Sequence, residues 1–94
     1  MNEAALLQRT RDLVYKANLP TTFGLGEAWI IVLATSEILP PSAADRYESA
    51  LADLKDHFPG DVLDFSHTHR SGAARYLLLR AGSPVVNYWQ GRSS

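Results

Sequence analysis

The sequence predicts a small α+β domain with two layers and a mixed sheet. Three observations carry this prediction: a β-prone apolar run at residues 28–35, two segments with apolar side chains at helical spacing, and an alternating hairpin near residue 70. Along the chain they give the order helix, strand, helix, strand, strand, and a final element that is either helix or strand. The sheet therefore has three strands, or four if the final element is a strand.

The first helix is predicted over residues 3–17. Asn2 suits the N-cap position, and Glu3 suits the positive end of the helix dipole. The side chains expected to face the core share one stripe: Leu6, Leu7, Thr10, Leu13, Val14 and Ala17. Gly24 and Gly26 then follow a helix and precede a strand, an order that predicts a turn and not a dinucleotide-binding loop.

Residues 28–35 form the longest uncharged, β-prone run, and their length favours a strand over a short buried helix. Such a strand is normally central and covered on both sides. Two helices and three strands offer no obvious cover for its second face, so either the aromatic tail or a second copy of the chain supplies it. We predict a homodimer on this ground. The two expected faces are Trp29, Ile31 and Leu33, and Ile30, Val32 and Ala34.

The second helix is predicted from Ser42 to about Phe58, where Pro59 and Gly60 end it. Strands follow at residues 61–67 and 75–80, antiparallel across a turn at residues 70–73. The first strand, second helix and second strand form a crossover unit. The buried stripe expected on the second helix is Tyr47, Ala50, Leu51, Leu54 and Phe58.

The tail at residues 83–90 is ambiguous between helix and strand. Ser83 and Pro84 resemble a helix start, whereas Val85 and Val86 favour a strand. We give a slight preference to the helix, with Gly91 as the residue that follows its end, and expect residues 91–94 to be frayed. In either form the aromatic side chains of the tail dock on the core.

Composition limits the class of protein. Ninety-four residues make one domain, covering residues 1–94. The absence of cysteine excludes disulfides, zinc–thiolate sites and cysteine nucleophiles. The acidic start and the lack of a long apolar run predict no signal peptide and no membrane span, hence a cytoplasmic protein. A net charge of −1 argues against nucleic-acid binding.

His67, His69 and Arg70 are the candidate chemical residues. Two histidines at i and i+2 on a strand point to the same side, so both imidazoles could bind one metal, or act beside the arginine in phosphodiester cleavage. A catalytic metal site needs a third protein ligand, and the sequence supplies no convincing one. The greater weight goes to structural or solvent-exposed histidines. We therefore assign no catalytic residue, no metal and no cofactor.

The function predicted from the sequence is a small non-enzymatic binding or assembly module, homodimeric and open to a further protein partner. Its expected interaction surface is aromatic: Trp29, Phe23, Trp89 and Tyr88. One alternative is a small hydrolase or nuclease-like toxin that uses the histidine hairpin. Another is a small-ligand binder with a pocket between the helices and the sheet.

Overall fold

The computed structural model describes residues 2–17, 29–36, 41–69 and 72–93. Its six elements follow the predicted order, α-β-α-β-β-α, which confirms the α+β class and makes the ambiguous tail a helix. The strands are β1 (Trp29–Ser36), β2 (Val62–His69) and β3 (Gly72–Arg80). The helices are α1 (Glu3–Ala17), α2 (Pro41–His57) and α3 (Pro84–Ser93).

The sheet has the order β1-β3-β2, with both pairings antiparallel. The prediction of a mixed sheet with β1 at its centre is therefore wrong. β3 turns back from β2 and lies between β1 and β2. These two outer strands run in the same direction and are not paired with each other, as in a split β-α-β unit. The centre belongs to β3, where Leu77, Leu78 and Leu79 are almost fully buried.

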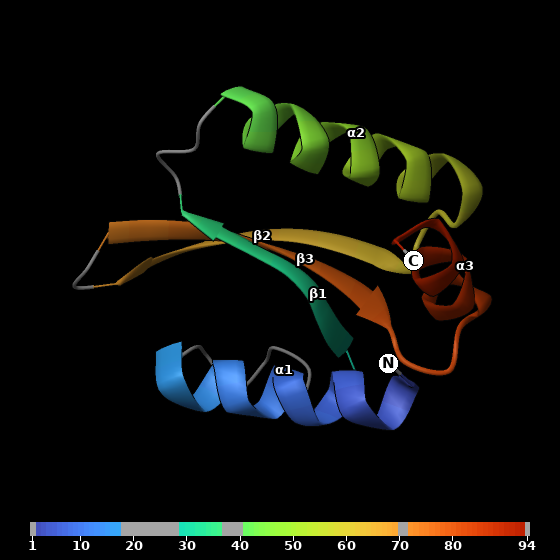
Figure 1. Cartoon of the computed structure of the whole chain (residues 1–94), viewed down its shortest axis with the longest axis horizontal. Helices are drawn as coiled ribbons and strands as arrows, with labels where there is room; N and C mark the ends of the chain where they lie inside the picture. The colour runs from blue at the N-terminus through green and yellow to red at the C-terminus, as the bar shows by residue number, and fades with distance from the viewer. Residues whose placement is uncertain (1, 18–28, 37–40, 70–71, 94) are drawn as a thin grey trace.

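Helices cover both faces of the sheet, so the prediction of two layers is also wrong. α1 lies on one face, while α2 and α3 lie on the other (Figure 1). On the α1 side, Val14 packs with Trp29 and Ile31. On the opposite side, Ile30 and Val32 pack in the larger core cluster with residues of α2 and α3. The chain itself thus covers both faces of β1, and the reason given for a homodimer no longer holds; the oligomeric state stays a prediction.

Local bonds explain where the terminal helices begin. The Asn2 side chain accepts a hydrogen bond from the Ala5 N–H at 2.8 Å, as predicted for an N-cap. The Glu3 carboxylate accepts one from the Gly82 N–H at 2.7 Å, and Gly82 has a φ of 81°, which glycine adopts without strain. These contacts bring both ends of the described chain to the end of the sheet where β3 finishes (Figure 1).

α3 begins after Ser83, as predicted, and its length differs from the prediction. The Ser83 hydroxyl accepts a hydrogen bond from the Val85 N–H at 3.3 Å and donates one to Asp61 at 2.7 Å. The helix does not end at Gly91 and continues to Ser93, over part of the tail expected to be frayed. Arg92 is thereby held on a helix rather than on an irregular tail.

β1 contains an irregularity that the sequence did not indicate. Its register with β3 shifts by one residue between Ile31 and Leu33, as in a β-bulge. The shift places Leu33 against the core cluster on the α2 and α3 side, not beside Trp29 and Ile31 as predicted. Next to the bulge, the Ile31 N–H donates to the hydroxyl of Thr10 at 2.9 Å, and that hydroxyl donates to the Leu6 carbonyl at 2.9 Å.

Thr10→Val is expected to lower the free energy of unfolding by about 1–3 kcal/mol. Valine has the same shape and leaves the buried Ile31 N–H without its acceptor, which costs the desolvation of that group. Urea denaturation followed by circular dichroism measures the change. Thr10→Ser, which keeps the hydroxyl, should lose clearly less. An unchanged free energy of unfolding in Thr10→Val would show that the hydrogen bond does not stabilise the fold.

Candidate functional site

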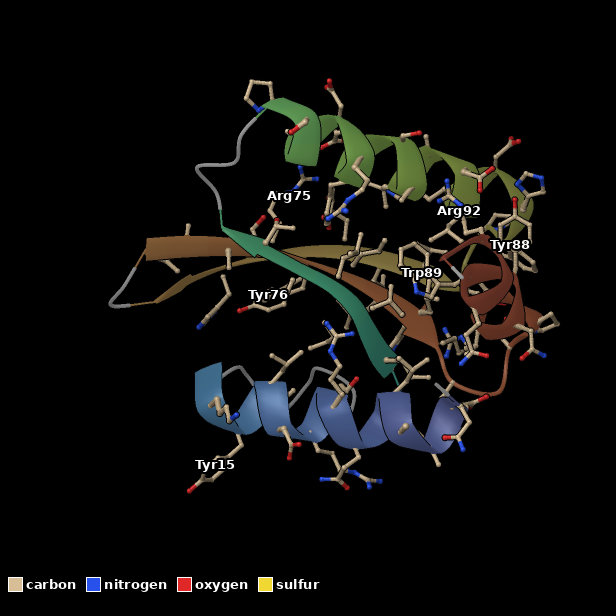
Figure 2. The ribbon with its side chains drawn as sticks, viewed as in Figure 1. Tyr15, Arg75, Tyr76, Tyr88, Trp89 and Arg92 are labelled. Atoms are coloured by element: carbon tan, nitrogen blue, oxygen red, sulfur yellow. The ribbon has the colours of Figure 1, made fainter. Side chains whose placement is uncertain are left out.

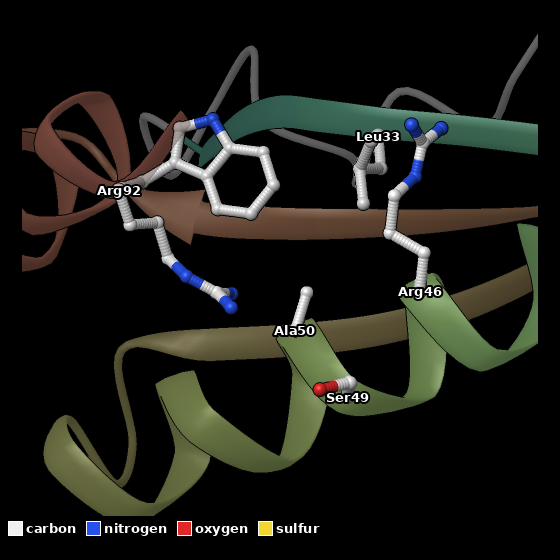
Figure 3. A pocket seen from close by; sticks show the side chains of 6 residues that line it. Leu33, Arg46, Ser49, Ala50 and Arg92 are labelled. Carbon is white, nitrogen blue, oxygen red and sulfur yellow. The ribbon is translucent and has the colours of Figure 1, made fainter. Parts of the chain in front are cut away.

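An open pocket of about 420 Å³ lies between α2, α3 and β1 (Figure 3). This volume falls in the range of small-molecule sites. Arg46 and Arg92 stand on opposite sides of the pocket, with Ala50 between them. The lining residues are Leu33 from β1, Arg46, Ser49 and Ala50 from α2, and Trp89 and Arg92 from α3.

Helical spacing explains why these side chains meet. Arg46 and Ser49 are three residues apart on α2, beside the buried stripe that holds the helix on the sheet, and Trp89 and Arg92 have the same spacing on α3. Leu33 reaches the pocket because of the bulge in β1. The wall is therefore apolar at the sheet and on the indole of Trp89, and cationic at both flanks.

The two arginines that line the pocket differ in whether they form an ion pair. Arg92 pairs with Asp53 at 3.6 Å and lies 6.0 Å from the centre of the Trp89 ring. Arg46 is exposed and forms no ion pair within the part of the chain that the structure describes. The Arg46 guanidinium is thus available to an anion, whereas that of Arg92 is partly neutralised.

Asp53 organises the side of the pocket formed by α3. It accepts a hydrogen bond from the Tyr88 hydroxyl at 2.9 Å, in addition to its contact with Arg92. This bond raises the pKa of Tyr88, so the phenol remains a donor at neutral pH. Tyr88 also stacks on His57, with ring centres 5.1 Å apart. The contacts fix α3 against the end of α2 and hold Arg92 in place (Figure 2).

A second polar cluster, Tyr47, Glu48, Asp64 and Arg75, lies between α2 and the sheet. The Tyr47 hydroxyl donates to Asp64 at 2.5 Å, and Arg75 donates to Asp64 at 2.8 Å and also to Glu48. The Arg75 guanidinium lies 4.4 Å above the Tyr47 ring. Burial and the bond to Asp64 raise the pKa of Tyr47, and the hydrogen bonds to both carboxylates raise that of Arg75. We interpret this cluster as a clamp that ties α2 to β2 and β3.

The histidine hairpin is only partly visible. His67 is partly buried on the side of α1, where its ring lies 6.2 Å from that of Phe65. The backbone of His69 ends β2, opposite Gly72, and Arg70 lies outside the described residues. Among the residues that the structure does describe, no group of three or more potential metal ligands comes together. The proposed roles of these three residues stay predictions.

The structure describes three of the four residues of the predicted aromatic surface, and these three do not form one exposed patch. Trp29 is 3% exposed and lies under the Arg80 guanidinium, which is 4.4 Å from the centre of its ring. Its assignment to an interaction surface is therefore wrong: its side chain faces α1 in the core. Phe23 lies outside the described residues. Trp89 and Tyr88 are partly buried and belong to the pocket and its support.

Sequence reasoning identified Trp89 and missed the other pocket residues. Arg46 and Ser49 lie outside the buried stripe that the sequence predicted for the second helix, and Arg92 was expected in a frayed tail. The usable signal was the spacing of three between Trp89 and Arg92, which puts them on one face only if the tail is a helix. Leu33 gave no signal, because no glycine or proline marks the bulge.

No family model, curated protein or solved structure matches this chain. Across the residues that the structure describes, none of the helices is both long and apolar enough to cross a membrane.

Proposed function

We propose that this domain is a binding module for a small organic anion, held in the pocket between α2, α3 and β1. The single observation that carries the proposal is the position of the exposed Arg46 guanidinium at the rim of a cavity whose wall includes Trp89. A ligand with a carboxylate or phosphate on an aromatic or aliphatic body matches both parts. The proposal combines the predicted binding module with the small-ligand alternative.

The chemistry of the lining supports binding. A guanidinium donates paired hydrogen bonds to a planar or tetrahedral oxyanion, and an indole offers a large, rigid apolar surface. Ser49 adds one hydroxyl that can donate to an oxyanion or accept from a ligand. A cytoplasmic location and self-association, both predicted from the sequence, complete the proposal.

Phenyl phosphate is a suitable first probe, because it joins an aromatic ring to an oxyanion. It should bind the unmodified protein, and Arg46→Met should weaken binding about tenfold, which corresponds to roughly 1.4 kcal/mol. The reason is the loss of a charge-assisted hydrogen bond while the aliphatic packing is kept. Isothermal titration calorimetry measures the dissociation constants at fixed ionic strength.

Arg9→Met is the matched control. Arg9 is exposed on α1, on the other side of the sheet, and the change removes the same charge. It should leave binding unchanged. Equal weakening by both variants would mean that only net charge matters, and equal binding of uncharged benzyl alcohol would mean that the anion is not recognised. Either result would reject the proposed site.

A further inference from the structure

The two edges of the sheet differ in their protection. At the β1 edge, a bulge interrupts the strand and the Thr10 side chain takes up the Ile31 N–H. The β2 edge has neither device: its register with β3 is unbroken from Val62 to His69, and this segment contains no proline and no lysine. Edge strands that avoid pairing usually carry such devices.

One hydrogen bond fixes which backbone groups of β2 face outward. The Arg80 N–H donates to the Asp61 carbonyl at 3.0 Å, at the point where β2 begins to pair with β3. Antiparallel pairs alternate between bonded and non-bonded positions. The residues whose N–H and C=O groups point away from β3 are therefore Val62, Asp64, Ser66 and Thr68. Within the described chain, β3 is the only strand beside β2.

We propose that a second copy of this chain pairs along this edge, with the two β2 strands antiparallel and the two sheets joined into one. A twofold axis restricts the choice of register. If the axis passes through Phe65, all four outward-facing residues form hydrogen-bonded pairs with outward-facing residues of the second copy. Centred on Ser66 or Asp64 it engages only three of them, and the Asp64 centre puts the two Asp64 carboxylates opposite each other, which is unfavourable.

The side chains of β2 can face those of a second β2 in the Phe65 register without opposing like charges, which is why the partner is a copy of the chain. Asp64 lies opposite Ser66 of the second copy, and Val62 opposite Thr68. On the other face, Phe65 lies opposite itself, where two aromatic rings can pack. No carboxylate meets a carboxylate. This interface differs from the covered β1 face that first suggested a dimer.

Single cysteines test the register directly, because the chain has none of its own. Phe65→Cys should form an intermolecular disulfide under mild oxidation, since non-bonded antiparallel positions lie within disulfide reach. Leu63→Cys is the control: Leu63 is 44% exposed, yet in this register it lies far from its own copy. Non-reducing electrophoresis measures the cross-linked fraction. Equal cross-linking at both positions, or preferred cross-linking of Ser66→Cys, would overturn the register.

The mass in solution tests the association itself. The unmodified chain should scatter light as about twice its mass of 10.4 kDa at micromolar concentration. Ser66→Pro should reduce this to the mass of one chain, because proline removes an outward N–H without breaking the ladder between β2 and β3. Circular dichroism verifies that the variant is folded. A single-chain mass for the unmodified protein would overturn the proposal, whatever the variant does.

Discussion

Trp29→Ala is expected to remove about 3–5 kcal/mol from the free energy of unfolding. The indole is 3% exposed and packs with Ile31, Tyr76 and Leu78 between the sheet and α1. Its removal leaves a cavity that the neighbouring strand residues cannot fill without breaking the register. Because domains of this size have roughly 5–15 kcal/mol of stability, the loss should be a large part of the whole. Chemical denaturation monitored by circular dichroism measures it.

Tyr15→Ala is the control for this large effect. Tyr15 is 88% exposed and points away from the sheet on α1 (Figure 2). An aromatic side chain in that position contributes little, so the change should stay within about 0.5 kcal/mol. If the two variants lost the same amount, the packing of Trp29 against α1 would not contribute to the stability of the fold.

Asp64→Asn is expected to cost about 1–3 kcal/mol at neutral pH, because the charged acceptor of the Tyr47 and Arg75 bonds becomes neutral. Burial opposes ionisation of Asp64, but the hydrogen bonds from Tyr47 and Arg75 outweigh it and hold its pKa below the ordinary value of 3.8. The carboxylate therefore stabilises the fold when it is charged. Denaturation at a series of pH values compares the variant with the unmodified protein.

The sign of the pH dependence follows from the lowered pKa. The stability that Asp64 contributes is fully present above its unfolded pKa of about 3.8 and is lost as the pH falls through the lower folded value. The gap between Asp64→Asn and the unmodified protein should thus narrow below pH 4. Asp12→Asn, an exposed carboxylate on α1, should have little effect at any pH. A gap that stayed constant with pH would contradict the role of the charge.

Local patterns predicted the elements well. The first helix has the bounds that its stripe indicated, and the buried residues expected on α2 lie in or against the core. Both predictions depend only on the spacing of apolar residues within one segment, and this spacing determines which face of a helix is buried. The Ser83 start of α3 was likewise visible, since capping depends on adjacent residues.

The arrangement of the strands could not be predicted in the same way. A strand such as β1 that is apolar on both faces must be covered on both, but helices on either side provide this cover at an edge as well as at the centre. The position of β3 depends on how the hairpin of β2 and β3 packs against β1. This long-range pairing cannot be predicted from the spacing of residues within one segment. The pocket was hidden for a related reason, because its lining comes from three separate elements.

The position of β3 between β1 and β2 has a consequence for synthesis. The β1 strand leaves the ribosome early, but its only described neighbour in the sheet, β3, is made after α2 and β2. Until then, Trp29, Ile30 and Ile31 have no strand to pair with, and unpaired apolar strands are prone to aggregate. The hairpin of β2 and β3 joins residues close in sequence, and local pairs form faster than distant ones. The most apolar segment of the chain thus obtains its partner strand late in synthesis, and β1 is where the nascent chain is most prone to aggregate.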